Sequence, residues 1–174
     1  MQHRVLVAYA TKYGATAEIA ERIGEVLRTA GLQVDVMSAD RAGDVATYTA
    51  VVLGSAVYAG AWRKEAAEFL ADHERALAAR PLWLFSSGPT GDGDPVELMK
   101  GWTFPEAQQP IADRLHPRDI TFFHGAIDPK KLNFAEKLLV KGIKAPTGDF
   151  RRWDVITAWA GEIAVILQTE LVLA

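Results

Sequence analysis

The chain has 174 residues, of which 49% are hydrophobic and 24% are charged, and its formal net charge is −3. This length and composition predict one globular domain over residues 1–174, and the charge argues against nucleic acid as the main partner. The chain contains no cysteine, which excludes disulfides, thiolate catalysis and cysteine-ligated metal clusters. A strand is predicted directly after Met1–Arg4, which leaves no room for a signal peptide. No apolar run approaches the roughly 20 residues of a membrane span, so we expect a soluble, cytoplasmic protein.

The first predicted elements are a strand, a loop and a helix. Val5–Tyr9 is a short apolar run typical of a buried parallel strand, and helical periodicity extends from Ala15 to Ala30. The first N–H groups of a helix lack partners, and Gly14 lets the backbone approach a ligand closely. The loop between strand and helix therefore predicts a site for a terminal phosphate monoester. Its residues are Thr11, Lys12, Tyr13, Gly14, Ala15 and Thr16.

Neutral donors dominate this loop. Thr11 and Thr16 add hydroxyl groups without charge, whereas Lys12, its one cation, is expected to point to solvent. The loop lacks both the GxxxxGK[ST] pattern of nucleotide triphosphatases and the GxGxxG pattern of dinucleotide folds. The alternative interpretation is an ordinary strand-to-helix connection with Thr16 as the cap.

The pattern Thr-x-x-Gly-x-Thr at residues 11–16, directly after the first strand, resembles the FMN phosphate loop of flavodoxins. Over nearly its whole length the chain is similar to the flavodoxin-domain branch that includes menaquinone-dependent protoporphyrinogen oxidase. The resemblance implies a flavodoxin-like fold with FMN as the cofactor.

The later elements continue the same alternation. Leu32–Val36 alternates apolar and polar residues, as in a half-exposed edge strand, and Ala50–Gly54 is continuously apolar, as in a central strand. Two more apolar runs predict a fourth and a fifth strand. We therefore expect an α/β, doubly wound, five-stranded parallel sheet of order 2-1-3-4-5 with helices on both faces, and a ligand site at the carboxyl ends of its strands. The remaining predicted elements are strands Leu82–Phe85 and Ile120–Phe123 and helices Arg63–Ala79, Glu106–Leu115 and Trp153–Leu171.

Two loops at that edge are predicted to hold the flavin ring. In the loop after the third strand, small residues permit close contact with a flat ring, and Tyr58 or Trp62 could cover its face. The alternative is that both aromatic side chains pack at the start of the next helix. The loop after the fourth strand offers hydroxyl and N–H groups for the pyrimidine edge of a flavin. The predicted flavin-binding residues of the two loops are Ala56, Val57, Tyr58, Ala59, Gly60, Ser86, Ser87, Gly88 and Pro89.

Residues 128–152 exceed a minimal flavodoxin-like domain and form a basic insertion between the last strand and the last helix. They contain seven Lys and Arg against three Asp and Glu, a net charge of +4, which leaves −7 on the rest of the chain. Such a basic amphipathic helix is typical of a surface for a membrane, an acidic protein or a second copy of the chain. Alternatively, its apolar face packs on the domain. That face comprises Leu132, Ala135, Leu138, Leu139 and Ile143.

The resemblance and the basic insertion together favour an FMN-dependent oxidoreductase. Its implied small-molecule substrates are a porphyrinogen and a quinone acceptor, and a place at the inner face of the membrane would follow. The alternatives are a one-electron carrier and a non-catalytic FMN-binding module. No metal-ligand cluster is predicted. His124, at the end of the fifth strand, is the one weak candidate for proton transfer, and the alternative is a structural role for this histidine.

Overall fold

A computed structural model describes residues 4–173 of the chain, with side chains to residue 170. The residues before Arg4, on which the expectation about a signal peptide depends, lie outside this range. Within the described residues, no helix is both long enough and apolar enough to span a membrane.

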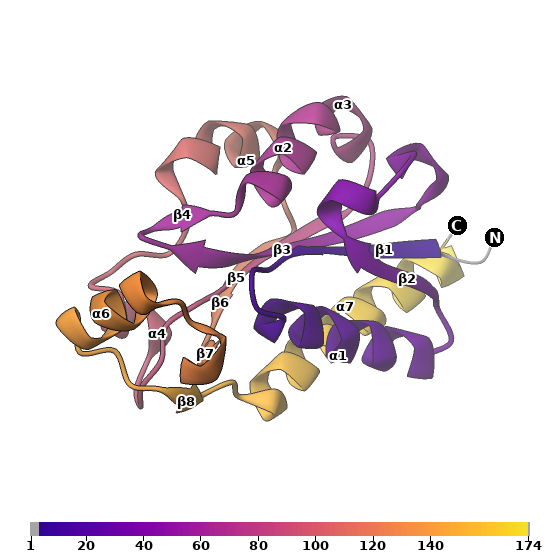
Figure 1. Cartoon of the computed structure of the whole chain (residues 1–174). Coiled ribbons are helices and arrows are strands. Elements are labelled where there is room, and N and C mark those ends of the chain that lie inside the picture. Colours follow the sequence, from indigo (N-terminus) through magenta and orange to yellow (C-terminus); the bar gives the residue numbers. More distant parts are fainter. Residues whose placement is uncertain (1–3, 174) are drawn as a thin grey trace.

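A parallel sheet organises the fold (Figure 1). Its five long strands run in the order β2-β1-β3-β5-β6, all parallel, which confirms the predicted 2-1-3-4-5 arrangement. Apolar runs of this kind suit strands that are buried on both faces. The strands are β1 (Arg4–Ala10), β2 (Gln33–Ser38), β3 (Ala50–Tyr58), β5 (Leu82–Ser87) and β6 (Asp119–Phe123).

A sixth strand was not predicted. β4 (Ala61–Trp62) folds back on the end of β3 and pairs with it antiparallel. The turn between them has positive φ at both central residues, +50° at Ala59 and +75° at Gly60, as tight hairpin turns require. A strand of two residues has no periodicity that a sequence could reveal.

Helices cover both faces of the sheet (Figure 1). On one face α1 (Ala15–Thr29) and α7 (Trp153–Leu173) pack together, and on the other lie α2 (Lys64–Asp72), α3 (Glu74–Leu77) and α5 (Gln109–Leu115). Successive residues of a strand point to opposite faces. The core is accordingly split in two, with Val5 and Val7 against α1 and α7 and Leu6 and Ala8 against the other layer.

One predicted helix is divided in two, and short helical turns occur in several loops. The predicted helix 63–79 is interrupted at His73, which joins α2 to α3 with φ −104° and ψ 13° and whose ring packs 4.7 Å from that of Phe69. Short 3-10 and α-helical turns fill the other loops. They are η1 (Ala39–Arg41), η2 (Val45–Thr47), α4 (Pro95–Leu98) and η3 (Glu106–Gln108).

The predicted helical insertion is present between β6 and α7. Two short antiparallel strands, β7 (Ala126–Ile127) and β8 (Gly148–Asp149), bracket it. Between them lie η4 (Pro129–Lys131) and α6 (Phe134–Gly142). Figure 1 shows α6 beyond the end of the sheet to which the β3 arrow points, which is the end where the ligand loops emerge.

Candidate functional site

The loop after β1 leaves the N-terminus of α1 open. Gly14 is the N-cap of α1 with φ +94°, and no side chain caps the helix. Thr11 Oγ1 instead accepts a hydrogen bond from the Gly14 N–H at 3.0 Å, inside the loop. A Cβ atom built on Gly14 would meet no atom within 4 Å. The helix therefore presents unpaired N–H groups and the positive end of its dipole to open space, as an anion site requires.

A buried pair of hydroxyls joins this loop to the end of β5. Thr16 Oγ1 and Ser87 Oγ lie 2.9 Å apart, and the two residues are only 1% and 2% exposed. Ser86, the neighbour of Ser87, accepts a hydrogen bond from Trp62 Nε1 at 2.7 Å. A buried hydrogen bond thus connects the loop after β1 to the loop after β5.

The loop after β5 also packs on the end of β3. A Cβ on Gly88 would lie 3.3 Å from the Cβ of Val57, and a Cβ on Gly125 would lie 2.7 Å from the Gly88 carbonyl oxygen. Glycine is needed at position 125 because any side chain would strike the backbone of the flavin loop. The three loops predicted from the sequence therefore meet at one edge of the sheet.

The two aromatic side chains of the β3–β4 hairpin have different surroundings. Trp62 is 6% exposed and packs on Phe104 with 5.1 Å between ring centroids. This position fits the interpretation that Trp62 packs in the core. Tyr58 is 44% exposed at the end of β3, with the Arg63 guanidinium 5.9 Å from its ring centroid. Burial raises the pKa of the Tyr58 phenol, and the positive charges of Arg63 and Lys12 oppose the rise. Tyr58 is thus the aromatic residue of this hairpin that stands free to contact a ligand.

A second tryptophan, Trp102, fixes the hairpin turn. Trp102 Nε1 donates a hydrogen bond to the Gly60 carbonyl oxygen at 3.1 Å. Its ring packs edge-on against Phe122 of β6, with centroids 4.8 Å apart. The turn is therefore attached to the far strand of the sheet, and its carbonyl orientation is set by an indole 42 residues away.

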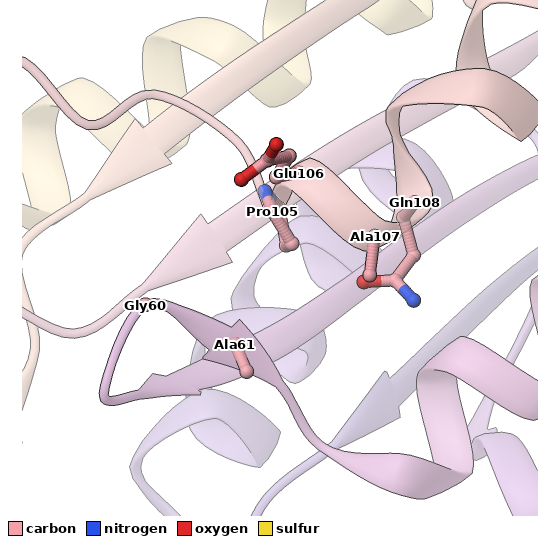
Figure 2. Close-up of a pocket in the computed structure, with 6 residues that line it drawn as sticks. All are labelled: Gly60, Ala61, Pro105, Glu106, Ala107 and Gln108. Carbon is pink, nitrogen blue, oxygen red and sulfur yellow. The ribbon is translucent and has the colours of Figure 1, made fainter.

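Beside the same turn lies a hollow of about 460 Å³ between the hairpin and η3 (Figure 2). Gly60 is the one predicted flavin-binding residue that lines it. The hollow adjoins the predicted site without containing its phosphate loop. It is lined by Gly60, Ala61, Pro105, Glu106, Ala107 and Gln108.

Glu136 of α6 reaches the phosphate loop. Its carboxylate accepts hydrogen bonds from the Lys12 ammonium and the Tyr13 hydroxyl, and from the Asn133 N–H at 2.9 Å, which completes a capping box. The Lys12 ammonium, then Tyr13 and the Asn133 N–H, lower the pKa of Glu136 from 4.5 to about 2. The expectation that Lys12 points to solvent is corrected: its side chain is partly exposed but paired with Glu136.

Two further cations of the insertion bind backbone carbonyls of the phosphate loop. Lys131 Nζ donates to the Tyr13 oxygen and Arg151 Nη1 to the Ala15 oxygen, both at 3.0 Å. Arg151 is in turn held by Asp149, whose Oδ2 lies 2.7 Å from Arg151 Nη2. The insertion is therefore anchored on the loop from both of its ends. The Asn133–Glu136 capping box can be read from the sequence, but its long-range contacts cannot.

His124 has a structural position. It is buried, and its Nε2 donates to the Gly93 carbonyl oxygen at 2.8 Å, which ties β6 to the loop after β5. Among the described residues, no group of three or more His, Cys, Asp or Glu side chains is arranged to hold a metal ion. The site is thus built from backbone groups, hydroxyls and aromatic rings.

The comparisons with known proteins agree with this geometry. The flavodoxin domain family matches residues 6–154. The chain therefore belongs to the flavodoxin domain family. None of the curated proteins searched matches it.

Solved structures of similar fold include flavodoxins. The Streptococcus pneumonia TIGR4 flavodoxin matches with a TM-score of 0.55 and 16% identity over 93% of this chain and 98% of its own. A point mutant of a flavodoxin from Pseudomonas aeruginosa matches with a TM-score of 0.59 and 12% identity, over 95% of this chain and 99% of its own. Rubredoxin oxygen:oxidoreductase from Desulfovibrio gigas matches with 0.59 and 15% over 97% of this chain, which spans 37% of the length of that protein.

Membership in the flavodoxin domain family makes this chain an FMN flavoprotein of an electron-transfer class. The residues present fit that cofactor, because an uncapped helix N-terminus with hydroxyl donors suits a single phosphate. Thr11–Thr16 would hold the phosphate, and the loops at 56–60 and 86–89 would hold the ring. When bound, FMN supplies the redox chemistry, and the protein supplies position and electrostatics.

Proposed function

We propose that this chain is an FMN-dependent oxidoreductase that oxidises a small anionic substrate of the porphyrinogen type and passes the electrons to a quinone. In the proposed reaction the porphyrinogen loses electrons with their protons and becomes a porphyrin. Six electrons and six protons leave the porphyrinogen, and three quinone molecules each take up two of each and become quinols. The sequence resemblance to the menaquinone-dependent protoporphyrinogen oxidase branch suggests these substrates.

One observation supports an enzyme above all. The insertion of net charge +4 is attached to the phosphate loop itself, through Glu136, Lys131 and Arg151. A positive surface fixed beside the cofactor loops raises the local concentration of an anionic substrate. A carrier that docks transiently on a protein partner does not need such an appendage.

The second candidate is a one-electron carrier of the flavodoxin type. The net charge of −7 outside the insertion favours it, because complementary charge steers an acidic carrier to a basic redox partner. The two candidates differ in turnover, since an enzyme converts a small substrate repeatedly without a protein partner.

Anaerobic turnover decides between them. The FMN-loaded protein is mixed with a porphyrinogen and a water-soluble quinone, and porphyrin formation is followed by fluorescence. Free FMN at the same concentration is the control for uncatalysed oxidation. Repeated turnover above that control supports the enzyme. A rate equal to that of free FMN, from a protein that still exchanges electrons with a flavodoxin reductase, supports the carrier.

A further inference from the structure

The outer face of α6 is the most apolar exposed feature of the described residues. Phe134, Leu138, Leu139 and Ile143 are 77%, 55%, 64% and 65% exposed. They account for four of the eight large apolar side chains that the described part of the chain leaves exposed, and α6 buries none of its residues. The alternative that the apolar face of the insertion packs on the domain is therefore wrong.

α6 rests on the domain along one narrow edge. Within Phe134–Gly142, Glu136 and Val140 are the two partly covered residues, and they lie four apart on the same side of the helix. Glu136 fixes that edge to Lys12 and Tyr13. The helix is thus held in place along that edge, while Phe134, Leu138, Leu139 and the C-cap residue Ile143 stay exposed.

Lysines border this outer face, and their charges are uncompensated. Lys130, Lys137, Lys141 and Lys144 are exposed and have no ion-pair partner among the described residues. The acidic groups of the insertion are used elsewhere. Asp128 caps η4, Glu136 pairs with Lys12, and Asp149 pairs with Arg151.

We propose that the α6 face, defined as Phe134, Leu138, Leu139 and Ile143 with the four bordering lysines, docks on an anionic phospholipid bilayer. Such a surface accepts apolar side chains at the boundary of its acyl chains and attracts lysines at its headgroups. The inference concerns where the chain docks, so it does not depend on the proposed reaction.

The charge distribution favours a bilayer over a second copy. In a twofold-symmetric pair the same patch meets itself, which would place the lysines of one copy against those of the other. The remaining surface carries −7 and is repelled by anionic lipid. Electrostatic attraction therefore favours approach to such a membrane with the α6 face foremost.

Docking in this orientation brings the flavin loops to the membrane. Pro146 and Leu98 both lie within 4 Å of a Cβ built on Gly91, so the end of the insertion and α4 meet over the loop after β5. Glu136 meets the loop after β1. The insertion consequently lies next to both loops, and docking through the α6 face would hold these loops near the membrane surface.

Vesicle flotation of the full FMN-loaded chain tests the proposal. Vesicles of phosphatidylcholine with phosphatidylglycerol are compared with phosphatidylcholine alone, at low and at high salt. We expect binding to the anionic vesicles that weakens as salt rises, because salt screens exposed charges. Lys137→Glu with Lys141→Glu, and separately Leu139→Ser with Ile143→Ser, should each weaken binding at least about tenfold.

Matched variants provide the controls. Arg41→Glu with Arg75→Glu changes the net charge equally at exposed positions outside the insertion, and Val155→Ser with Val165→Ser removes exposed apolar side chains from α7. Both should bind vesicles like the unaltered chain, and all variants should keep their FMN.

Three results would overturn the proposal. The first is no binding to anionic vesicles at low salt, and the second is equal loss of binding in the control variants. The third is a concentration-dependent dimer, without vesicle binding, that Leu139→Ser with Ile143→Ser abolishes. That result would assign the face to a second copy.

Discussion

Lys12 of the phosphate loop and Glu136 of α6 form an ion pair between residues 124 positions apart in the chain. The Tyr13 hydroxyl donates a hydrogen bond to the same carboxylate. The pair connects the loop between β1 and α1 to the insertion between β6 and α7. The properties of the phosphate loop and of α6 are therefore coupled.

The first prediction concerns pH. The folded pKa of Glu136 lies below its ordinary value, so the carboxylate stabilises the docked insertion fully above about pH 4.5. That stability is lost as the pH falls toward 2. A carboxyl-detected NMR titration should give an apparent pKa near 2, and the protection of the α6 amides, relative to their intrinsic exchange rates, should fall over the same range. Glu136→Gln should exchange quickly at every pH, and titration of Glu136 near 4.5 would contradict the ion pair.

The strand order could be read from the sequence because each central strand is a continuous apolar run. Val5–Tyr9 and Ala50–Gly54 have no polar face, so they had to lie inside a parallel sheet. The open N-terminus of α1 at Gly14 could also be predicted, since it depends on consecutive residues. Such local features can be predicted because they depend on residues that are adjacent in the sequence.

Contacts between distant residues could not be read. Nothing in the sequence around Lys12 distinguishes a solvated lysine from one paired with Glu136. Tyr58 and Trp62 lie four residues apart, yet Trp62 is buried against Phe104 and Tyr58 is 44% exposed. The β3–β4 turn decides which of the two aromatic residues faces the site. This turn could not be predicted, because the two residues of β4 are too few to show a strand pattern.

The second prediction concerns the choice of flavin. The phosphate loop offers one uncapped helix terminus and therefore suits one phosphate, so FMN should bind in preference to FAD. At about a hundredfold excess over its dissociation constant, FMN should stabilise the fold by roughly 2.7 kcal/mol. Thermal melts should show a rise of several degrees with FMN. A clear shift with FAD or a nucleotide, and none with FMN, would contradict the prediction.

The third prediction concerns Thr16. Thr16→Ala removes a buried hydroxyl that faces Ser87 and lies in the phosphate loop. The change leaves the buried Ser87 hydroxyl without this partner, which costs roughly 1–3 kcal/mol. Because this pair fixes the base of the phosphate loop, FMN affinity should fall about tenfold. Fluorescence titration measures it. Thr29→Ala, at the exposed end of α1, is the control and should leave affinity unchanged.

Gly14→Val tests the same phosphate loop through its backbone. At φ +94° any side chain is strained, and this one would occupy the open space in front of α1. The variant should bind FMN more weakly than Thr16→Ala does. Wild-type affinity in both variants would place the phosphate elsewhere.

The fourth prediction separates the two aromatic residues of the hairpin. Trp62→Ala removes a core side chain and should lower the free energy of unfolding by roughly 3–5 kcal/mol. Tyr58→Ala should change it by less than about 0.5 kcal/mol, as at an exposed site. It should, however, raise the fluorescence of bound flavin, because a stacked ring quenches that emission. Unchanged fluorescence and affinity in Tyr58→Ala would remove this residue from the site.

The fifth prediction concerns the close packing that holds β3 and β5 in register beneath the site. Gly54 of β3 pairs with Phe85 of β5, and a Cβ on Gly54 would lie 2.0 Å from Phe85 Cζ. Gly54→Ala therefore forces the ring out of its contacts with Phe123 and Trp159. Overpacking of this kind should lower the free energy of unfolding by about 1–3 kcal/mol or more. Denaturant melts measure the loss.

Phe85→Leu gives the matched test of the cause, because it shortens the side chain that the new methyl group would strike. The double variant Gly54→Ala with Phe85→Leu should be more stable than the sum of the two single losses predicts, since each change relieves the other. Strict additivity would mean that Gly54→Ala acts through the backbone instead. In that case the contact between Gly54 and Phe85 would not determine the spacing of β3 and β5, the two strands that precede the flavin loops.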